Sequence, residues 1–121
     1  MTDAIDFEAH DAYRACAEMT GFIYGLEDRF PEDELPLLFS RLRAAAMEVG
    51  ASLAAGIAGD GVDARGRLSP AASREARGRL GALRHFVLTA RQQFFLDEHH
   101  LETFDGYHER IRAALAVPEG S

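Results

Sequence analysis

Residues 9–30 read AHDAYRACAEMTGFIYGLEDRF, and their apolar side chains recur at alternating steps of three and four positions. The recurring positions are Ala9, Ala12, Cys16, Met19, Ile23, Leu26 and Phe30. Because an α-helix turns once in about 3.6 residues, this spacing places the set on one helix face. The stretch predicts an amphipathic helix with one buried face, and it favours an all-α fold.

The same rhythm returns in three later segments. Their apolar stripes are Leu35, Leu38, Leu42, Ala45, Val49, Leu53 and Ile57; then Leu80, Leu83, Val87, Ala90 and Phe94; then Leu101, Phe104, His108, Ile111 and Leu115. Ser69 with Pro70 predicts the start of the third helix, and Asp97 predicts the start of the fourth. We expect helices over residues 4–29, 32–58, 70–96 and 98–116, joined by a loop over 59–69 that follows a glycine cap at Gly59 or Gly61. Four such helices with mostly short connections predict an antiparallel up-down four-helix bundle, with residues 1–121 as a single domain.

Composition narrows the classes of protein that this chain can be. Its 121 residues fit one domain, and 47 % hydrophobic content is enough for a buried core. Cys16 is the only cysteine, so no intrachain disulfide can form. The N-terminus lacks the features of a signal peptide, and no apolar run approaches the ~20 residues of a membrane span. We therefore expect a cytoplasmic protein that does not contact a membrane.

A family resemblance rests mainly on the first two segments. It is carried by Phe7 with Glu8, Tyr13, Ile23 with Tyr24, Leu26 and Phe30 with Pro31, and then by Leu38, Ser40, Leu42 with Arg43, Ala45 with Ala46, Val49 and residues 54–56. In these features the chain resembles the small bacterial four-helix-bundle proteins first noticed in intervening sequences of ribosomal RNA genes. The stretch GALRHFVLTA, through Gly81, Leu83 and Phe86, is also similar to the accessory proteins of diversity-generating retroelements. The resemblance spans about residues 7–115; it implies a bundle that assembles into a five-membered ring, and it implies no catalytic residues.

The glycine-rich stretch VGASLAAGIAGDG, residues 49–61, has two readings. A phosphate-binding loop would need a preceding strand, which the helical pattern does not provide. Close helix packing fits better, because Gly50, Ala54 and Gly56 present a smooth surface that lets a neighbouring backbone approach. We expect these three residues to contact a helix of the same subunit or of the next one.

Further apolar side chains lie outside the four stripes, and the stripes alone do not bury them from solvent. They are Phe22, Tyr24, Leu37, Phe39, Phe86, Phe95 and Tyr107. An interface between subunits would bury them. We therefore expect Phe22, Tyr24, Phe39, Phe86 and Tyr107 to be helix-packing or oligomer contacts. We expect the protein to be a non-enzymatic scaffold or adaptor whose partners are other copies of itself or another protein.

An arginine-rich region offers an alternative function. All 13 basic residues are arginines, and Arg65, Arg67, Arg74, Arg77 and Arg84 lie close together in the sequence. Such a face could contact RNA or another anionic partner, as in a retroelement accessory protein that serves a reverse transcriptase. The net charge of −7 favours protein contacts over nucleic acid.

Metal and enzyme chemistry have less support. Asp97 with His100 and Asp105 with His108 imitate the carboxylate–histidine pairs of di-iron bundles, but both pairs fall in one segment. We predict no metal, no cofactor and no catalytic residue. His108 lies on the apolar stripe, where a pH-sensitive contact is an open hypothesis.

Overall fold

The computed structural model describes residues 7–115, and this part of the chain is almost wholly helical. The main helices are α1 (Asp11–Tyr24), α2 (Ser40–Asp60), α3 (Pro70–Gln92) and α4 (Glu98–Ala113). Short 3-10 turns, η1 (Phe7–Ala9), η2 (Glu27–Arg29) and η3 (Glu32–Glu34), and one π-helical turn, η4 (Leu35–Phe39), precede or separate them. The predicted all-helical fold class is confirmed.

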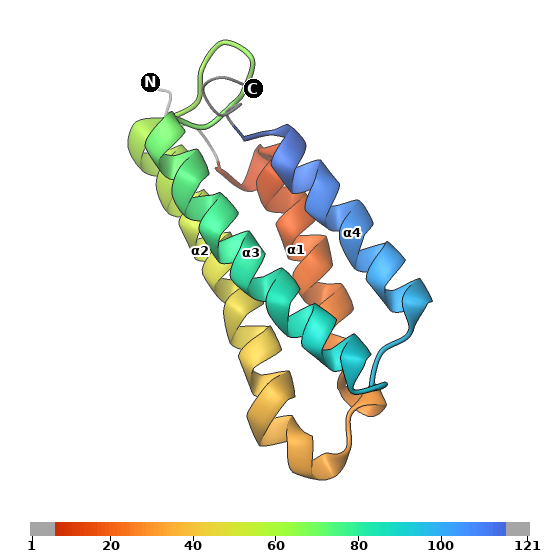
Figure 1. Ribbon diagram of the computed structural model, residues 1–121. Coiled ribbons are helices and arrows are strands. Elements are labelled where there is room, and N and C mark those ends of the chain that lie inside the picture. Colours follow the sequence, from red (N-terminus) through yellow and green to blue (C-terminus); the bar gives the residue numbers. More distant parts are fainter. Residues whose placement is uncertain (1–6, 116–121) are drawn as a thin grey trace.

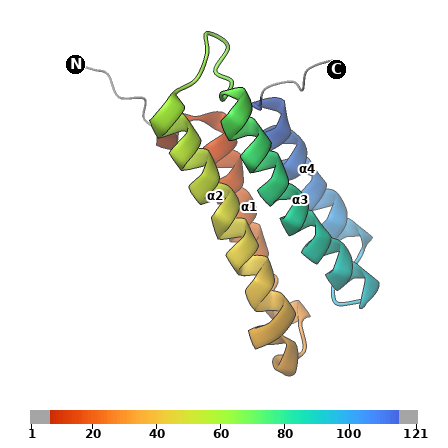
Figure 2. The same ribbon diagram turned by 60° about the vertical axis from the view of Figure 1, so that its left-hand side comes forward.

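The four helices lie alongside one another as a bundle (Figure 1). α1 packs against α2 and α4, and α3 packs against α2 and more sparsely against α4. Consecutive helices are joined at alternate ends, so the loop between α2 and α3 lies at the same end as the start of α1 and the end of α4 (Figures 1 and 2). This end and the opposite end, where η4 and the α3–α4 connection lie, are the two places where loops and helix termini meet.

Helix capping explains why α3 and α4 begin where they do. The Ser69 hydroxyl accepts a hydrogen bond from the Ala72 N–H at 3.2 Å, and Pro70 occupies the first helical position. Asp97 accepts from the His100 N–H at 3.0 Å, while the His100 ring accepts from the Asp97 N–H. Both predicted starts are confirmed, because each side chain satisfies an N–H group that the helix leaves unpaired.

Most of the predicted stripes form one continuous core. In the first stripe every position from Ala12 to Phe30 is buried, but Ala9 is exposed because it lies in η1 instead of α1. α1 also ends at Tyr24, five residues before the predicted end, and the chain reaches Leu26 and Phe30 through a turn. The predicted residues 4–6 and 116 lie outside the described part of the chain.

The start of the second helix differs from the prediction in register. The Ser40 N–H donates to the Leu35 carbonyl, a π-type bond across five residues, and this turn rotates the side chains before α2. Leu35 and Leu38 are only half-buried, whereas Phe39 is 2 % exposed and belongs to the core. Of the two roles expected for Phe39, helix packing or oligomer contact, its burial in the core of one subunit agrees with helix packing.

The end of α3 departs from its stripe for a related reason. The helix ends at Gln92, four residues before the predicted end. The N–H groups of Phe94 and Phe95 donate to the carbonyls of Arg91 and Ala90, so the chain reverses in the pattern of a Schellman cap. Phe94 leaves the core and is 91 % exposed, and Leu96 is buried in its place.

α2 ends two residues later than predicted, and its cap is Gly61. The Gly61 N–H donates to the Ile57 carbonyl at 3.0 Å, and its φ of 76° is one that glycine adopts readily. The loop that follows therefore comprises residues 61–69.

Candidate functional site

The small residues of α2 face two different neighbouring helices, α1 and α3. A Cβ atom added at Gly56 would lie 2.8 Å from the Ala72 Cβ of α3, which is closer than real Cβ atoms come. A Cβ at Gly50 would lie 3.6 Å from the Cys16 Sγ of α1, an ordinary contact distance. Close backbone approach is therefore required at Gly56, against a helix of the same subunit.

Gly50 and Ala54 instead line an open groove between α1 and α2, with a volume of about 400 Å³. Its other walls are Phe7, Tyr13, Cys16, Ala17, Thr20, Ala46, Met47 and Ala51. Met47 is 59 % exposed at the edge of the groove, and the Tyr24 hydroxyl donates to its sulfur at 3.5 Å. The Arg43 guanidinium lies 5.8 Å from the centre of the Tyr24 ring. These contacts make the α1–α2 face an apolar surface with an ordered aromatic edge.

The remaining aromatic residues predicted as interface contacts do not share this surface. Phe22 and Tyr107 are half-buried against each other between α1 and α4, with ring centres 5.9 Å apart. Phe86 is half-buried on α3, with its ring centre 5.4 Å from that of His85. Together with Phe39 in the core, this arrangement divides the predicted set among several places in the bundle.

Two exposed apolar side chains, Leu37 and Phe94, lie at the η4 end of the bundle, and Phe94 is the more exposed of the two. Leu37 is 59 % exposed there and borders an open pocket of about 550 Å³. Gln93 and Phe95, the neighbours of Phe94, line the same pocket. The exposure of Met47 and Phe94 was not predicted, because helical periodicity alone does not show where a helix stops or which off-stripe positions a neighbour covers.

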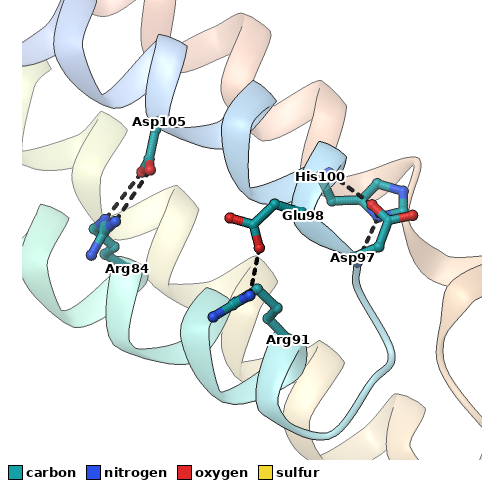
Figure 3. Close-up of polar contacts among 6 residues, drawn as sticks. All are labelled: Arg84, Arg91, Asp97, Glu98, His100 and Asp105. Atoms are coloured by element: carbon teal, nitrogen blue, oxygen red, sulfur yellow. Dashed lines mark hydrogen bonds and ion pairs between the residues drawn. The ribbon is translucent and has the colours of Figure 1, made fainter.

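The five arginines predicted as an anionic-partner contact do not act as one face. Arg84 donates two hydrogen bonds, at 3.0 and 3.1 Å, to the Asp105 carboxylate of α4 (Figure 3). This bidentate pair raises the pKa of the Arg84 guanidinium further above its usual value. Arg74 is exposed on α3 and Arg77 is half-buried there, whereas Arg65 and Arg67 lie in the loop. The charge of Arg84 is therefore already compensated within the subunit.

Other acidic side chains also pair within the subunit. The Arg91 guanidinium contacts the Glu98 carboxylate across the α3–α4 connection (Figure 3), and Arg79 contacts Glu48 at 3.0 Å. All these side chains are more than a third exposed, so each pair contributes little to stability. Because Glu48 and Glu98 already have arginine partners within the subunit, they are less available for pairing with another subunit.

The carboxylate–histidine pairs considered for a metal have other partners. Asp97 and His100 form the capping box of α4, and Asp105 holds Arg84 (Figure 3). Among residues 7–115 no group of three or more histidine, cysteine, aspartate or glutamate side chains is placed to hold a metal ion.

His108 occupies its predicted stripe position and is half-buried, with its ring centre 5.9 Å from that of Phe104. Burial lowers the pKa of His108, and the charges of Arg112 and Arg84 lower it further against the weaker opposing effects of Asp105 and Glu109. The folded state therefore favours the neutral ring.

This shift predicts a pH-dependent stability. Below the ordinary histidine pKa of about 6.5 the unfolded chain binds a proton that folded His108 resists, so acidification favours unfolding until the lower folded pKa is passed. We expect the free energy of unfolding to fall between pH 7.5 and 5.5 by less in His108→Gln than in the wild type, as measured by urea titration. His99→Gln, at an exposed position, is the matched control and should keep the wild-type dependence. Equal pH profiles for wild type and His108→Gln would contradict this assignment.

No protein-family model matches the chain, and no curated protein sequence matches it. The helices of the described part of the chain include none that combines the length and apolar character of a membrane span.

Proposed function

We propose that the chain is a cytoplasmic, non-enzymatic adaptor, an antiparallel up-down four-helix bundle that self-associates. The alternate ends at which consecutive helices are joined support the up-down order (Figures 1 and 2). The proposed ring of five subunits rests on the family resemblance alone. One observation carries the proposal of self-association: Phe94 is both strained and exposed.

Phe94 has a φ of 65°, a left-handed backbone conformation that costs a residue with a Cβ about 1–2 kcal/mol. Glycine is the usual residue at this position of a Schellman cap because it avoids that cost. Within the subunit, 91 % of Phe94 remains exposed, so packing does not compensate for the strain. A contact with another molecule would provide the compensation, because burying a phenylalanine side chain is worth about 2 kcal/mol.

The α1–α2 groove is the surface that we propose for the opposite side of the contact. It is open and mostly apolar, and most of its lining residues are small. The exposed Met47 is one of them, and the Tyr24 hydroxyl donates to the Met47 sulfur. Contact between two different surfaces of identical subunits is head-to-tail and closes into a ring when the rotation between subunits is suitable. The two exposed surfaces of the subunit, at Phe94 and at the groove, thus agree with a ring.

Substitution of Phe94 by glycine tests this proposal, because stability and assembly should change in opposite directions. We expect Phe94→Gly to raise the free energy of unfolding of the monomer by about 1 kcal/mol through relief of strain. We expect self-association, measured by sedimentation velocity, to weaken at least about tenfold because the phenyl side chain no longer contacts the neighbouring subunit.

Phe94→Asn is the matched variant, since asparagine also tolerates the left-handed conformation, and it should lose self-association like glycine. Phe86→Ala removes a half-buried aromatic from the middle of α3 and should leave the Phe94-dependent contact in place. A more stable Phe94→Gly that assembles as well as the wild type would remove the main support for the proposal.

A retroelement-type accessory protein that binds RNA or a reverse transcriptase is the alternative. It has weaker support, because the pairing of Arg84 with Asp105 interrupts the proposed basic face and the net charge is −7. This alternative predicts RNA binding that weakens steeply with salt and is lost when Arg74 and Arg77 are replaced by glutamate. The di-metal alternative would require ligands other than Asp97 and Asp105, whose carboxylates have partners of their own.

A further inference from the structure

A pocket of about 510 Å³ lies at the end of the bundle where the α2–α3 loop meets the start of α1 and the end of α4. The side chains that matter in its wall are His10, Asp11, Arg65, Arg67 and Arg110. It is the end opposite η4 and the α3–α4 connection (Figure 1), and the pocket shares no lining residue with the α1–α2 groove.

The loop that carries Arg65 and Arg67 is held in one shape by Asp63. The Asp63 carboxylate accepts hydrogen bonds from the backbone N–H groups of Arg65 at 2.8 Å and Arg67 at 3.0 Å, and these bonds lower its pKa. The Asp63 N–H donates to the Arg67 carbonyl, and Val62 pairs with Leu68 as an isolated antiparallel bridge. Because the backbone is fixed, the two arginine side chains extend from defined positions.

His10 ties this loop to the first turn of α1. Its Nδ1 accepts a hydrogen bond from the Ala12 N–H at 3.1 Å, and its Nε2 lies 2.6 Å from the Gly66 carbonyl oxygen. Both bonds form when the proton is on Nε2, which then donates to Gly66. The loop arginines are thereby fixed beside the N-terminus of α1, whose backbone dipole adds a positive field.

The charges in the pocket are unequal. Arg110 contacts Asp11 at 3.3 Å and Glu18 at 3.1 Å, so its charge is compensated. Within residues 7–115, no carboxylate lies at ion-pair distance from the guanidinium of Arg65 or Arg67. The negative charge of Asp63 offsets part of the positive charge of Arg65 and Arg67, but its Oδ1 accepts hydrogen bonds from their backbone N–H groups and not from their side chains.

We propose that this pocket binds the phosphate group of a small molecule, with Arg65 and Arg67 as the hydrogen-bond donors. A guanidinium group can donate two parallel charge-assisted hydrogen bonds, and two oxygens of a phosphate group are spaced to accept both. The volume is within the range of about 300–1,000 Å³ that is usual for small-molecule sites. A long polyanion is a poorer fit, because the chain as a whole carries a net charge of −7.

Titration of the full chain with inorganic phosphate at constant ionic strength, followed by amide NMR, tests the proposal. We expect saturable shifts confined to the loop, the first turn of α1 and the last turn of α4. In Arg65→Gln and Arg67→Gln the apparent affinity should fall at least about fivefold, as expected for loss of one charge-assisted donor. Arg41→Gln, an exposed arginine at the other end of the bundle, is the matched control and should bind as the wild type does.

Circular dichroism of each variant separates loss of binding from loss of the fold. Absence of saturable shifts in the wild type, or unchanged affinity in the folded Arg65→Gln/Arg67→Gln double variant, would overturn the proposal. A single-stranded RNA that binds through the same two arginines far more tightly than phosphate would also overturn it and would favour the nucleic-acid alternative.

Discussion

Replacing Phe39 by alanine is expected to lower the free energy of unfolding by about 3–5 kcal/mol, the usual cost of truncating a buried phenylalanine. The ring is 2 % exposed and lies 5.1 Å, centre to centre, from the ring of Phe30. The guanidinium of Arg43, a residue of α2, lies over the Phe39 ring, 5.1 Å from its centre. Truncation would therefore leave a cavity that these neighbours fill only in part, and urea unfolding measures the loss.

Leu37→Ala is the matched control, because Leu37 belongs to the same π-helical turn but is 59 % exposed. Its stability should change by no more than about 0.5 kcal/mol, as at most surface positions. Both variants must be compared at one protein concentration, since self-association stabilises the folded state. A cost of less than about 1 kcal/mol for Phe39→Ala would contradict its place in the core and restore it as an interface residue.

Replacing Gly56 by valine is expected to lower the free energy of unfolding by about 1–3 kcal/mol, the usual cost of overpacking. The new Cβ would meet the Ala72 Cβ at 2.8 Å and the Leu68 Cδ2 at 3.3 Å. The Ala72 Cβ is fixed to the backbone of α3, so relief requires the two helices to move apart. Thermal and urea unfolding measure this cost.

Gly78→Val is the matched control in α3, where nothing lies within 4 Å of an added Cβ. We expect a change of no more than about 0.5 kcal/mol there, because valine has a slightly better helix propensity than glycine and meets no neighbour. If Gly56→Val were as stable as the wild type, the close approach of α2 and α3 at this point would be wrong.

The buried faces were predictable from the sequence because they depend on local periodicity. Met19, Val49, Leu83 and Ile111 lie on their predicted stripes and in the core. The caps at Ser69 and Asp97 were predictable for a similar reason, since each depends on a few adjacent residues.

The departures occur where a hydrogen bond changes the register. The π-type bond from Ser40 to Leu35 brings Phe39 into the core, and the cap after Gln92 turns Phe94 out of it.

The candidate site was less predictable, because it depends on pairing between distant residues. Arg84 was grouped with the loop arginines by proximity in the chain, but Asp105 compensates its charge. Arg110 was not predicted from the sequence, because it shares a pocket with Arg65 and Arg67 only when the end of α4 packs beside the α2–α3 loop. His10 and Gly66 are 56 positions apart in the sequence, and no local sequence pattern predicts a hydrogen bond between residues so far apart.

Sedimentation equilibrium of the full chain over the micromolar concentration range tests the central claim most directly. The proposal of a self-associating adaptor predicts a species with a mass of at least twice 13.3 kDa, and the proposed ring of five subunits predicts a mass of five times 13.3 kDa. A single species of 13.3 kDa at every concentration would contradict self-association and with it the proposed function.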